Sequence, residues 1–396
     1  MSRFTLPSIV FSCLALGVTS GLAVDPASPA IPGPIQAKPA SSQNRRPKPE
    51  TNPMPIRQLS LADDAARYLA GISLSPGSSL QTLTQDPRWI AHGNAMNNSF
   101  SALEQRQINN IRVFRSLNIA PTLPSCRNCL YLFGGPDFLY ADAMYPDCTT
   151  YVLQGLESVD PLPDLLTVPQ PALLATLQNI EISINSLVNF TFFETKDMRS
   201  DFQRSQLKGV LPIIFVFLAR SGKQVQGVEY ISLDKGGRIL QGGSGSVHGA
   251  RITFLDPAGG VQKTLYYFTS DLSDEALRAN PAVLRFCSSL GPSNSLLKAA
   301  SYLMHEGNFG TVRNFILQRS SAIVEDDSGI PIRYFTSDHW VPRFFGVYSG
   351  PIDLFRKYYQ PDLRNLYAAS SPKPLTFGFG YQFNPKTSGL ILVIRK

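Results

Sequence analysis

The chain has 396 residues, of which 43% are hydrophobic and 16% are charged, and its formal net charge is +7. This is an ordinary globular composition with enough apolar residues for a large core. Residues 1–58 hold six basic and two acidic residues, so the remaining 30 basic and 27 acidic residues give 59–396 a charge of only +3. No run of Lys and Arg in this body alternates with aromatic residues along one face, so the sequence excludes nucleic-acid binding.

Residues 1–23 have the parts of a secretory signal peptide. Arg3 supplies a positive charge, residues 4–17 are mostly apolar, and Gly21 and Ala23 are small residues before a cleavage site. The apolar core is short and is interrupted by Pro7, so we expect no transmembrane span. The pattern predicts export, to the periplasm or out of the cell.

Residues 24–58 are rich in proline and poor in apolar side chains. Such a segment cannot bury enough surface to offset its ordering entropy, and we expect a disordered tether. No internal repeat and no second Pro-rich linker follows. The pattern predicts a single globular domain over 59–396.

Three helices are predicted before residue 194. Residues 59–72 have helical spacing, and 86–117 have the clearest pattern, with Asp86 as N-cap and Pro87 at the first helical position. A second long helix is expected over 172–193. We predict that the two long helices cover opposite faces of a sheet.

The stretch 130–157 predicts a strand, a tight turn, a short helix and a second, parallel strand. An apolar run at 130–133 meets Gly134-Gly135-Pro136, and the β-prone run 149–153 leads to Gly155 and Glu157. In open α/β sheets, ligands bind beyond the carboxyl ends of parallel strands. We therefore predict a ligand site here whose residues include paired glycines and three acids: Gly134, Gly135, Asp137, Asp142 and Glu157.

The expected ligand is a small hydroxylated or cationic molecule. A carboxylate at Asp137, in the first helical turn, is stabilised by the helix dipole and repels phosphate. To the extent of about 30 residues, the unit resembles the start of a Rossmann-type or methyltransferase-like domain, with Glu157 standing 22 residues after Gly135. The spaced GxGxxG is absent, so the resemblance implies a Rossmann-like fold at 130–157, and we expect no cofactor.

Three cysteines precede the two parallel strands. Cys126 and Cys129 lie before the first strand and Cys148 before the second, so parallel pairing brings them to the same end of the sheet. In an oxidising compartment this predicts a disulfide of Cys148 with Cys126 or Cys129. The CxxC precedes a strand instead of following one, which disfavours a redox site, and no four-ligand metal set is visible.

The later sequence predicts further strands in hairpins. Residues 211–219 and 224–233 form one candidate, and 250–255 and 263–269 form another, so the whole sheet should be mixed. Two more hairpins are expected nearer the C-terminus, in the segments 321–335 and 375–394.

A hydrolytic site is the enzyme alternative. His339, in the segment 337–340, or His248, in the Gly-rich loop 236–249, would act with Asp137 or Asp142. No GxSxG elbow occurs in the sequence. His92 lies on the predicted helix 86–117, and His305 lies near the end of a helical pattern at 295–304, where packing or the helix dipole explains them.

The sequence thus predicts an exported α/β protein with one three-layer domain, a mixed sheet and flanking helices. The leading interpretation is a polar pocket that binds a small hydroxylated or cationic ligand. A hydrolase acting on an envelope or extracellular substrate and a non-catalytic envelope interaction module remain alternatives, and the oligomeric state stays open.

Overall fold

The computed structural model describes residues 56–123, 126–190, 207–258 and 260–396. The predicted signal peptide, 1–23, lies outside the described residues, as does the predicted tether except for its last three positions. Those three positions belong to α1 (Ile56–Leu69), so this helix begins before the predicted boundary at residue 59. Residues Pro53–Lys396 form one compact unit.

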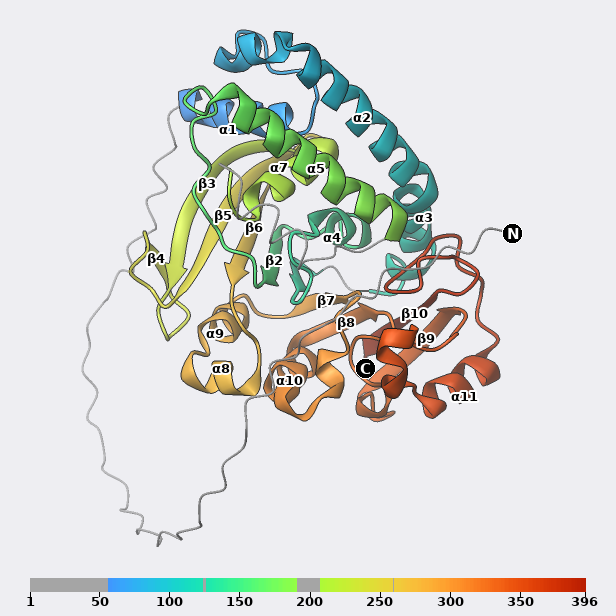
Figure 1. Cartoon of the computed structure of the whole chain (residues 1–396). Coiled ribbons are helices and arrows are strands. Elements are labelled where there is room, and N and C mark those ends of the chain that lie inside the picture. Colours follow the sequence, from blue (N-terminus) through green and yellow to red (C-terminus); the bar gives the residue numbers. More distant parts are fainter. Residues whose placement is uncertain (1–55, 124–125, 191–206, 259) are drawn as a thin grey trace, which may run out of the picture. The chain divides into compact units, whose positions relative to one another are not determined.

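The described residues form a ten-stranded sheet (Figure 1). Its strands in chain order are β1 (Asn128–Tyr131), β2 (Thr150–Gly155), β3 (Gln224–Leu233), β4 (Ile239–Gln241), β5 (Val247–Asp256), β6 (Val261–Thr269), β7 (Ser293–Leu297), β8 (Ser320–Glu325), β9 (Trp340–Gly346) and β10 (Gly389–Arg395). Across the sheet the order is β4-β3-β5-β6-β2-β1-β7-β8-β10-β9.

The sheet is mixed, as predicted. At its centre, β6, β2, β1, β7 and β8 are parallel neighbours. The flanking strands β3, β4, β5, β9 and β10 pair antiparallel. β1 and β2 pair in register from Asn128 with Thr150 to Tyr131 with Leu153, so the two strands of the 130–157 unit run the same way.

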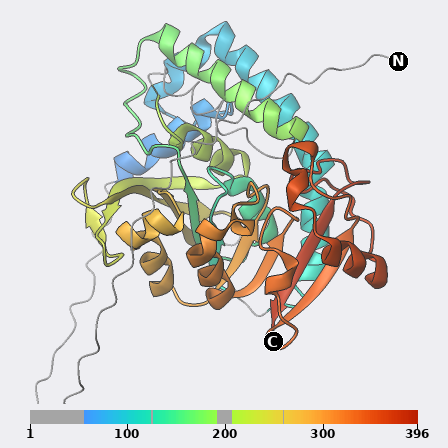
Figure 2. The same cartoon turned by 60° about the horizontal axis from the view of Figure 1, so that its bottom comes forward.

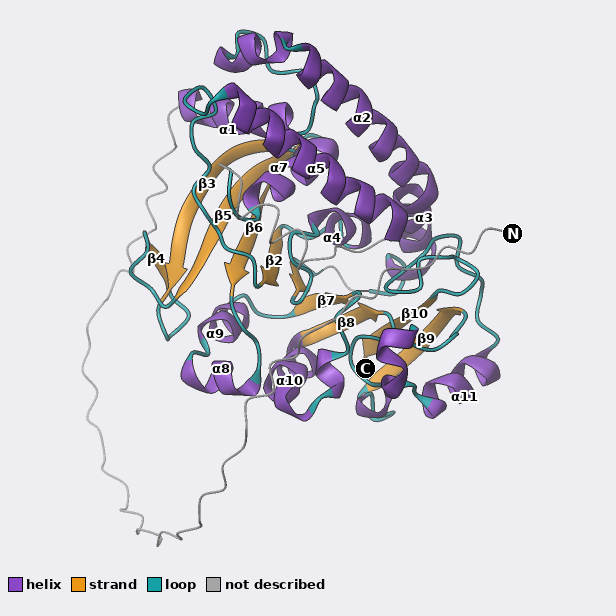
Figure 3. Cartoon of the chain, viewed as in Figure 1, coloured by secondary structure: helices purple, strands orange, loops and turns teal. Residues whose placement is uncertain are grey.

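Helices cover both faces and complete the three predicted layers (Figures 2 and 3). Side chains alternate across a strand, so Cys129 and Tyr131 of β1 face one helical layer and Leu130 and Leu132 face the other. The first layer contains α1, α2 (Pro87–Leu103), α3 (Asn109–Phe114), α4 (Phe138–Met144), α5 (Gln170–Phe190) and α7 (Leu211–Arg220). The second contains α8 (Asp274–Ala279), α9 (Ala282–Ser289), α10 (Gly310–Arg319) and α11 (Pro361–Ser370).

The long helices behave only partly as predicted. Asp86 caps α2 through the backbone N–H of Arg88, as expected. The prediction that the two long helices cover opposite faces is wrong, because α5 packs against α2: His92 lies 2.7 Å from Glu181, and Ser99 donates to Asn185 at 2.8 Å. Both helices have an apolar stripe, and a stripe does not specify which face of a sheet it covers. None of the described helices is both long and apolar enough to cross a membrane.

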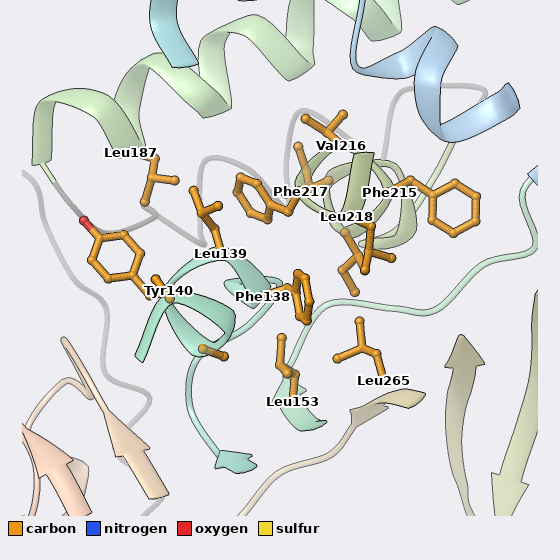
Figure 4. Packing of buried hydrophobic residues seen from close by; sticks show 14 of the residues in the cluster. Phe138, Leu139, Tyr140, Leu153, Leu187, Phe215, Val216, Phe217, Leu218 and Leu265 are labelled. Carbon is orange, nitrogen blue, oxygen red and sulfur yellow. The ribbon is translucent and has the colours of Figure 1, made fainter. Parts of the chain in front are cut away.

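Residues 211–219 form the helix α7, not the predicted strand. Each of them is buried, and an uninterrupted apolar run has no period that separates a buried helix from a buried strand. Figure 4 shows residues 215–218 of α7 beside Phe138 and Leu139 of α4. The interior of the first layer is therefore helix packed on helix as well as helix packed on sheet.

The two predicted C-terminal hairpins are also wrong. β8 pairs with β7 and β10, and residues Ile332–Tyr334 form a single 3-10 turn after Pro331, which has no N–H to donate to a ladder. β10 does not pair with 375–383. It lies between β8 and β9 and pairs antiparallel with both.

Candidate functional site

The carboxyl edge of the central strands gathers loops from distant parts of the sequence. β1 has β2 on one side and β7 on the other, so the chain reverses its direction of travel across the sheet there. Ligands of open α/β sheets bind beyond the carboxyl ends of the strands at such a point. β9 runs parallel to β8, because both are antiparallel to β10, and its carboxyl end therefore lies on the same edge.

Two loops at this edge have unusual backbone conformations. Five described residues other than glycine have a positive φ, and four of them follow β1 or β7: Phe133, Ala299, Ser301 and Tyr302. A left-handed conformation costs a non-glycine residue on the order of 1–2 kcal/mol. Such residues persist only where their surroundings fix them, and they cluster at ligand and active sites. Because four such residues gather here, this edge is a candidate ligand site.

A buried ion pair joins these two loops. Asp137 Oδ2 lies 2.8 Å from Lys298 Nζ, and the side chains are 3% and 1% exposed. Tyr131 donates its hydroxyl proton to the same carboxylate at 3.1 Å, and the ammonium lies 3.5 Å from the centre of the Tyr140 ring. Burial lowers the pKa of Lys298, while the charge of Asp137 raises it. Asp137 also caps α4 through the N–H of Tyr140, so its polar capacity is largely used inside the protein.

Three consecutive acids lie at the end of β8: Glu325 is its last residue, and Asp326 and Asp327 follow it. Asp326 accepts from the backbone N–H of Ala299 at 3.2 Å and from that of Tyr381 at 3.3 Å, and thereby ties two loops together. Burial raises the pKa of Asp327 to about 7, with a further contribution from the charge of Asp326. Burial also raises the pKa of Glu325 well above its usual range. These acids therefore hold the edge together.

Of the predicted ligand residues, the structure brings Gly135 and Glu157 together at the end of β2. Gly135 donates to the carbonyl of Gln154 at 3.0 Å, and a side chain at Gly155 would collide with both the Glu157 carboxylate and the backbone of Gly135. Glu157 accepts the hydroxyl proton of Tyr267 at 2.8 Å. Gly134 lies in the same turn, against the ring of Tyr131.

Asp142 lies away from this group. Its carboxylate is 3.2 Å from Lys223 Nζ and accepts from Tyr151 at 3.3 Å. Lys223 also pairs with Asp256 at 2.8 Å, at the end of the sheet where the parallel strands begin.

The structure does not bring either candidate histidine to these acids. His248 is exposed on β5, opposite Ser232, and His339 is exposed just before β9, at the opposite edge from Asp137. Among the described residues, Asp137, Asp142 and Glu157 contact lysine, tyrosine and backbone groups. The proposed hydrolytic pairs are therefore not assembled.

The described cysteines are free thiols, so the predicted disulfide is not formed in this structure. Cys148 Sγ contacts the backbone carbonyl of Cys126 at 3.3 Å instead of a second sulfur. Burial raises the pKa of Cys148 to about 12 and also raises the pKa of Cys126 and Cys129. No group of three or more His, Cys, Asp and Glu residues within the described ranges is arranged to hold a metal.

A cavity of about 180 Å³ opens at the carboxyl edge, between loops that follow β7, β8 and β9. No pattern in the sequence indicates this cavity. Its lining combines charged, aromatic and amide side chains with two apolar ones: His305, Ile332, Arg333, Lys357, Tyr358, Tyr359, Gln360, Pro361 and Asp362.

The protonation state of His305 is fixed by its surroundings. Nε2 lies 3.2 Å from the carbonyl oxygen of Asp327, and because a carbonyl only accepts, Nε2 carries the proton and Nδ1 is an acceptor. Burial lowers the pKa of His305 to about 4, so the ring is neutral at neutral pH. The sequence around His305 does not indicate its protonation state, because its burial and its contact with the Asp327 carbonyl both arise from the tertiary structure.

The walls of the cavity are tied to the buried acids. Gln360 donates to the Asp327 carbonyl at 3.2 Å and accepts from the N–H of Ile332 at 2.9 Å. The ring of Tyr358 stacks on Tyr302, with centroids 5.0 Å apart and planes 4° apart, and Tyr302 donates to Asp327 at 2.9 Å. Hydrogen bonds and ring stacking therefore hold these residues of the cavity wall in place.

Comparison with protein-family models and with curated proteins finds no match to this chain. The evidence for its function is therefore the geometry of the site.

We expect Asp137→Asn to lower the free energy of unfolding by about 3–5 kcal/mol, because it removes the carboxylate that neutralises the buried Lys298. Urea unfolding measures this change. The double variant D137N/K298M removes both charges and should recover much of the loss. A fall under about 1 kcal/mol for D137N, as for an exposed ion pair, would contradict this role.

Glu325 should make the protein less stable as pH rises. Burial raises its pKa in the folded state above the unfolded value. Between these two pKa values the folded chain binds more protons than the unfolded chain. Stability therefore falls as pH rises, until the pH has passed the folded pKa. Glu325→Gln mimics the protonated acid and should raise the melting temperature at pH 8 but not at pH 4. The exposed Glu275→Gln serves as control. Equal falls in melting temperature for E325Q at pH 4 and at pH 8 would contradict a raised pKa of Glu325 in the folded protein.

Proposed function

We propose that this protein binds a small hydroxylated ligand, of the size of one sugar ring, at the carboxyl edge of its sheet. The observation that carries this proposal is the cavity lined by loops after β7, β8 and β9. Its volume of about 180 Å³ lies below the roughly 300–1,000 Å³ of pockets for drug-sized molecules. The ligand is accordingly small.

The chemistry of the lining favours hydroxyl groups. A hydroxyl both donates and accepts, and the residues that line the cavity include acceptors, His305 and Asp362, and donors, Arg333 and Lys357. Tyr358 and Tyr359 add aromatic surface, which packs against the apolar faces of a ring. The two cationic side chains disfavour the cationic ligand that the sequence had left open.

The buried pair Asp137–Lys298 and the acids after β8 support this site without touching the ligand. They hold loops whose backbone is strained, so the binding residues are already in place before the ligand arrives. Preorganisation of this kind reduces the entropy lost on binding.

A panel of neutral monosaccharides, uronic acids and polyols tests the proposal by thermal shift and calorimetry on the full chain. At least one compound should raise the melting temperature. His305→Phe removes the acceptor, and losing about one hydrogen bond of 0.5–1.5 kcal/mol should weaken binding up to about tenfold. His248→Phe, on an exposed strand position, is the matched control. If no compound binds, or if H305F binds as tightly as the parent, the proposal fails.

We also propose that the chain is exported, on the basis of residues 1–23, which would expose the cavity to extracellular or envelope sugars. The mature protein should be recovered outside the cytoplasm and begin at Val24. N-terminal sequencing decides this, and a cytoplasmic protein that retains Met1–Ala23 would contradict it.

A further inference from the structure

Three sulfur-containing side chains line one cavity at the opposite, amino edge of the parallel strands. Cys126, Met144 and Cys148 line a single cavity of about 50 Å³, together with Arg115 and Asn294. Cys126 precedes β1, Cys148 precedes β2, and Met144 ends the helix between these strands. Parallel pairing of β1 with β2 therefore places two thiols at one edge, and α4 brings the thioether to them.

Burial and access at this cavity suit a bound ion. Cys148 and Met144 are buried, whereas Cys126 is only partly buried and provides a path from solvent. The Cys126 thiol lies 3.4 Å from the carbonyl of Pro292, and the Cys148 thiol lies 3.3 Å from the carbonyl of Cys126. Neither thiol is part of a disulfide, so both are available as ligands.

The ligand chemistry selects the ion. Thiolate and thioether are soft ligands, which favour Cu(I), whereas structural zinc takes four ligands and calcium and magnesium take oxygen. Within the described ranges no group of three or more His, Cys, Asp and Glu residues is arranged to hold a metal, so a site here needs the thioether of Met144 as its third ligand. We propose that Cys126 and Cys148, with Met144 as a third ligand, bind one Cu(I) ion.

Binding of Cu(I) balances in protons and in charge. Each thiol loses its proton to solvent as its sulfur bonds to the metal, so one Cu(I) replaces two protons and the site gains a net charge of −1 on the ion and its two thiolates. Arg115 and Asp147 line the same cavity as an ion pair, so together they add no net charge to the site. No oxidant or reductant is required, because copper enters and remains as Cu(I).

Competition with the colorimetric Cu(I) chelator bicinchoninate tests this proposal under anaerobic, reducing conditions. The protein is the full chain carrying Cys13→Ser, which removes the cysteine of the predicted signal peptide. It should take one equivalent of Cu(I). Cys126→Ser and Cys148→Ser should each weaken binding at least tenfold, and Met144→Leu should weaken it less.

Cys287→Ser is the matched control, because Cys287 is a buried free thiol packed in the other helical layer. It should leave the affinity for Cu(I) unchanged. Circular dichroism checks that each variant folds, and Cys126→Ser, at a partly buried position, keeps the test valid if Cys148→Ser does not. No uptake of Cu(I), uptake unaffected by C126S and C148S, or tighter binding of Zn(II) than of Cu(I) would overturn the proposal.

Discussion

Parallel pairing of β1 with β2 on one side and with β7 on the other is the constraint on which the rest of this structure depends. It brings the loops after these strands to one edge of the sheet and the segments before them to the other. The Asp137–Lys298 pair and the sugar-sized cavity belong to the carboxyl edge, and the sulfur-lined cavity belongs to the amino edge. Both proposed sites therefore follow from strand direction.

The carboxyl edge is held by buried charge instead of by regular secondary structure. Ala299, Ser301 and Tyr302 adopt conformations that side chains rarely take, and they are fixed through Lys298, Asp326 and Asp327. Breaking a buried pair leaves an uncompensated charge in the interior, which is why such a pair can stabilise an otherwise unfavourable backbone. The backbone carbonyl of Asp327 also contacts His305 and Gln360, so the support of the loops and the walls of the cavity form one connected set.

Local features of this fold could be predicted from the sequence, and contacts across the sheet could not. The cap at Asp86 and the parallel strands of 130–157 follow from short patterns of capping, turn and apolar residues. The helix α7 was missed because its apolar run has no period. Lys298 and His305 were missed as site residues because their importance rests on Asp137 and Asp327, which are far away in the sequence. Gly135 and Glu157 lie together because each of them follows one of two parallel strands. Position at a strand end does not indicate which side chains Asp137 and Asp142 pair with.

The central claim is that the loops after β7, β8 and β9 form the ligand site. Hydrogen–deuterium exchange with and without a bound monosaccharide tests it most directly, because exchange reports local protection along the whole chain. Protection should increase in residues 302–306, 331–334 and 357–362, with little change elsewhere. Protection confined to residues 134–157, or spread evenly over the sheet, would contradict it.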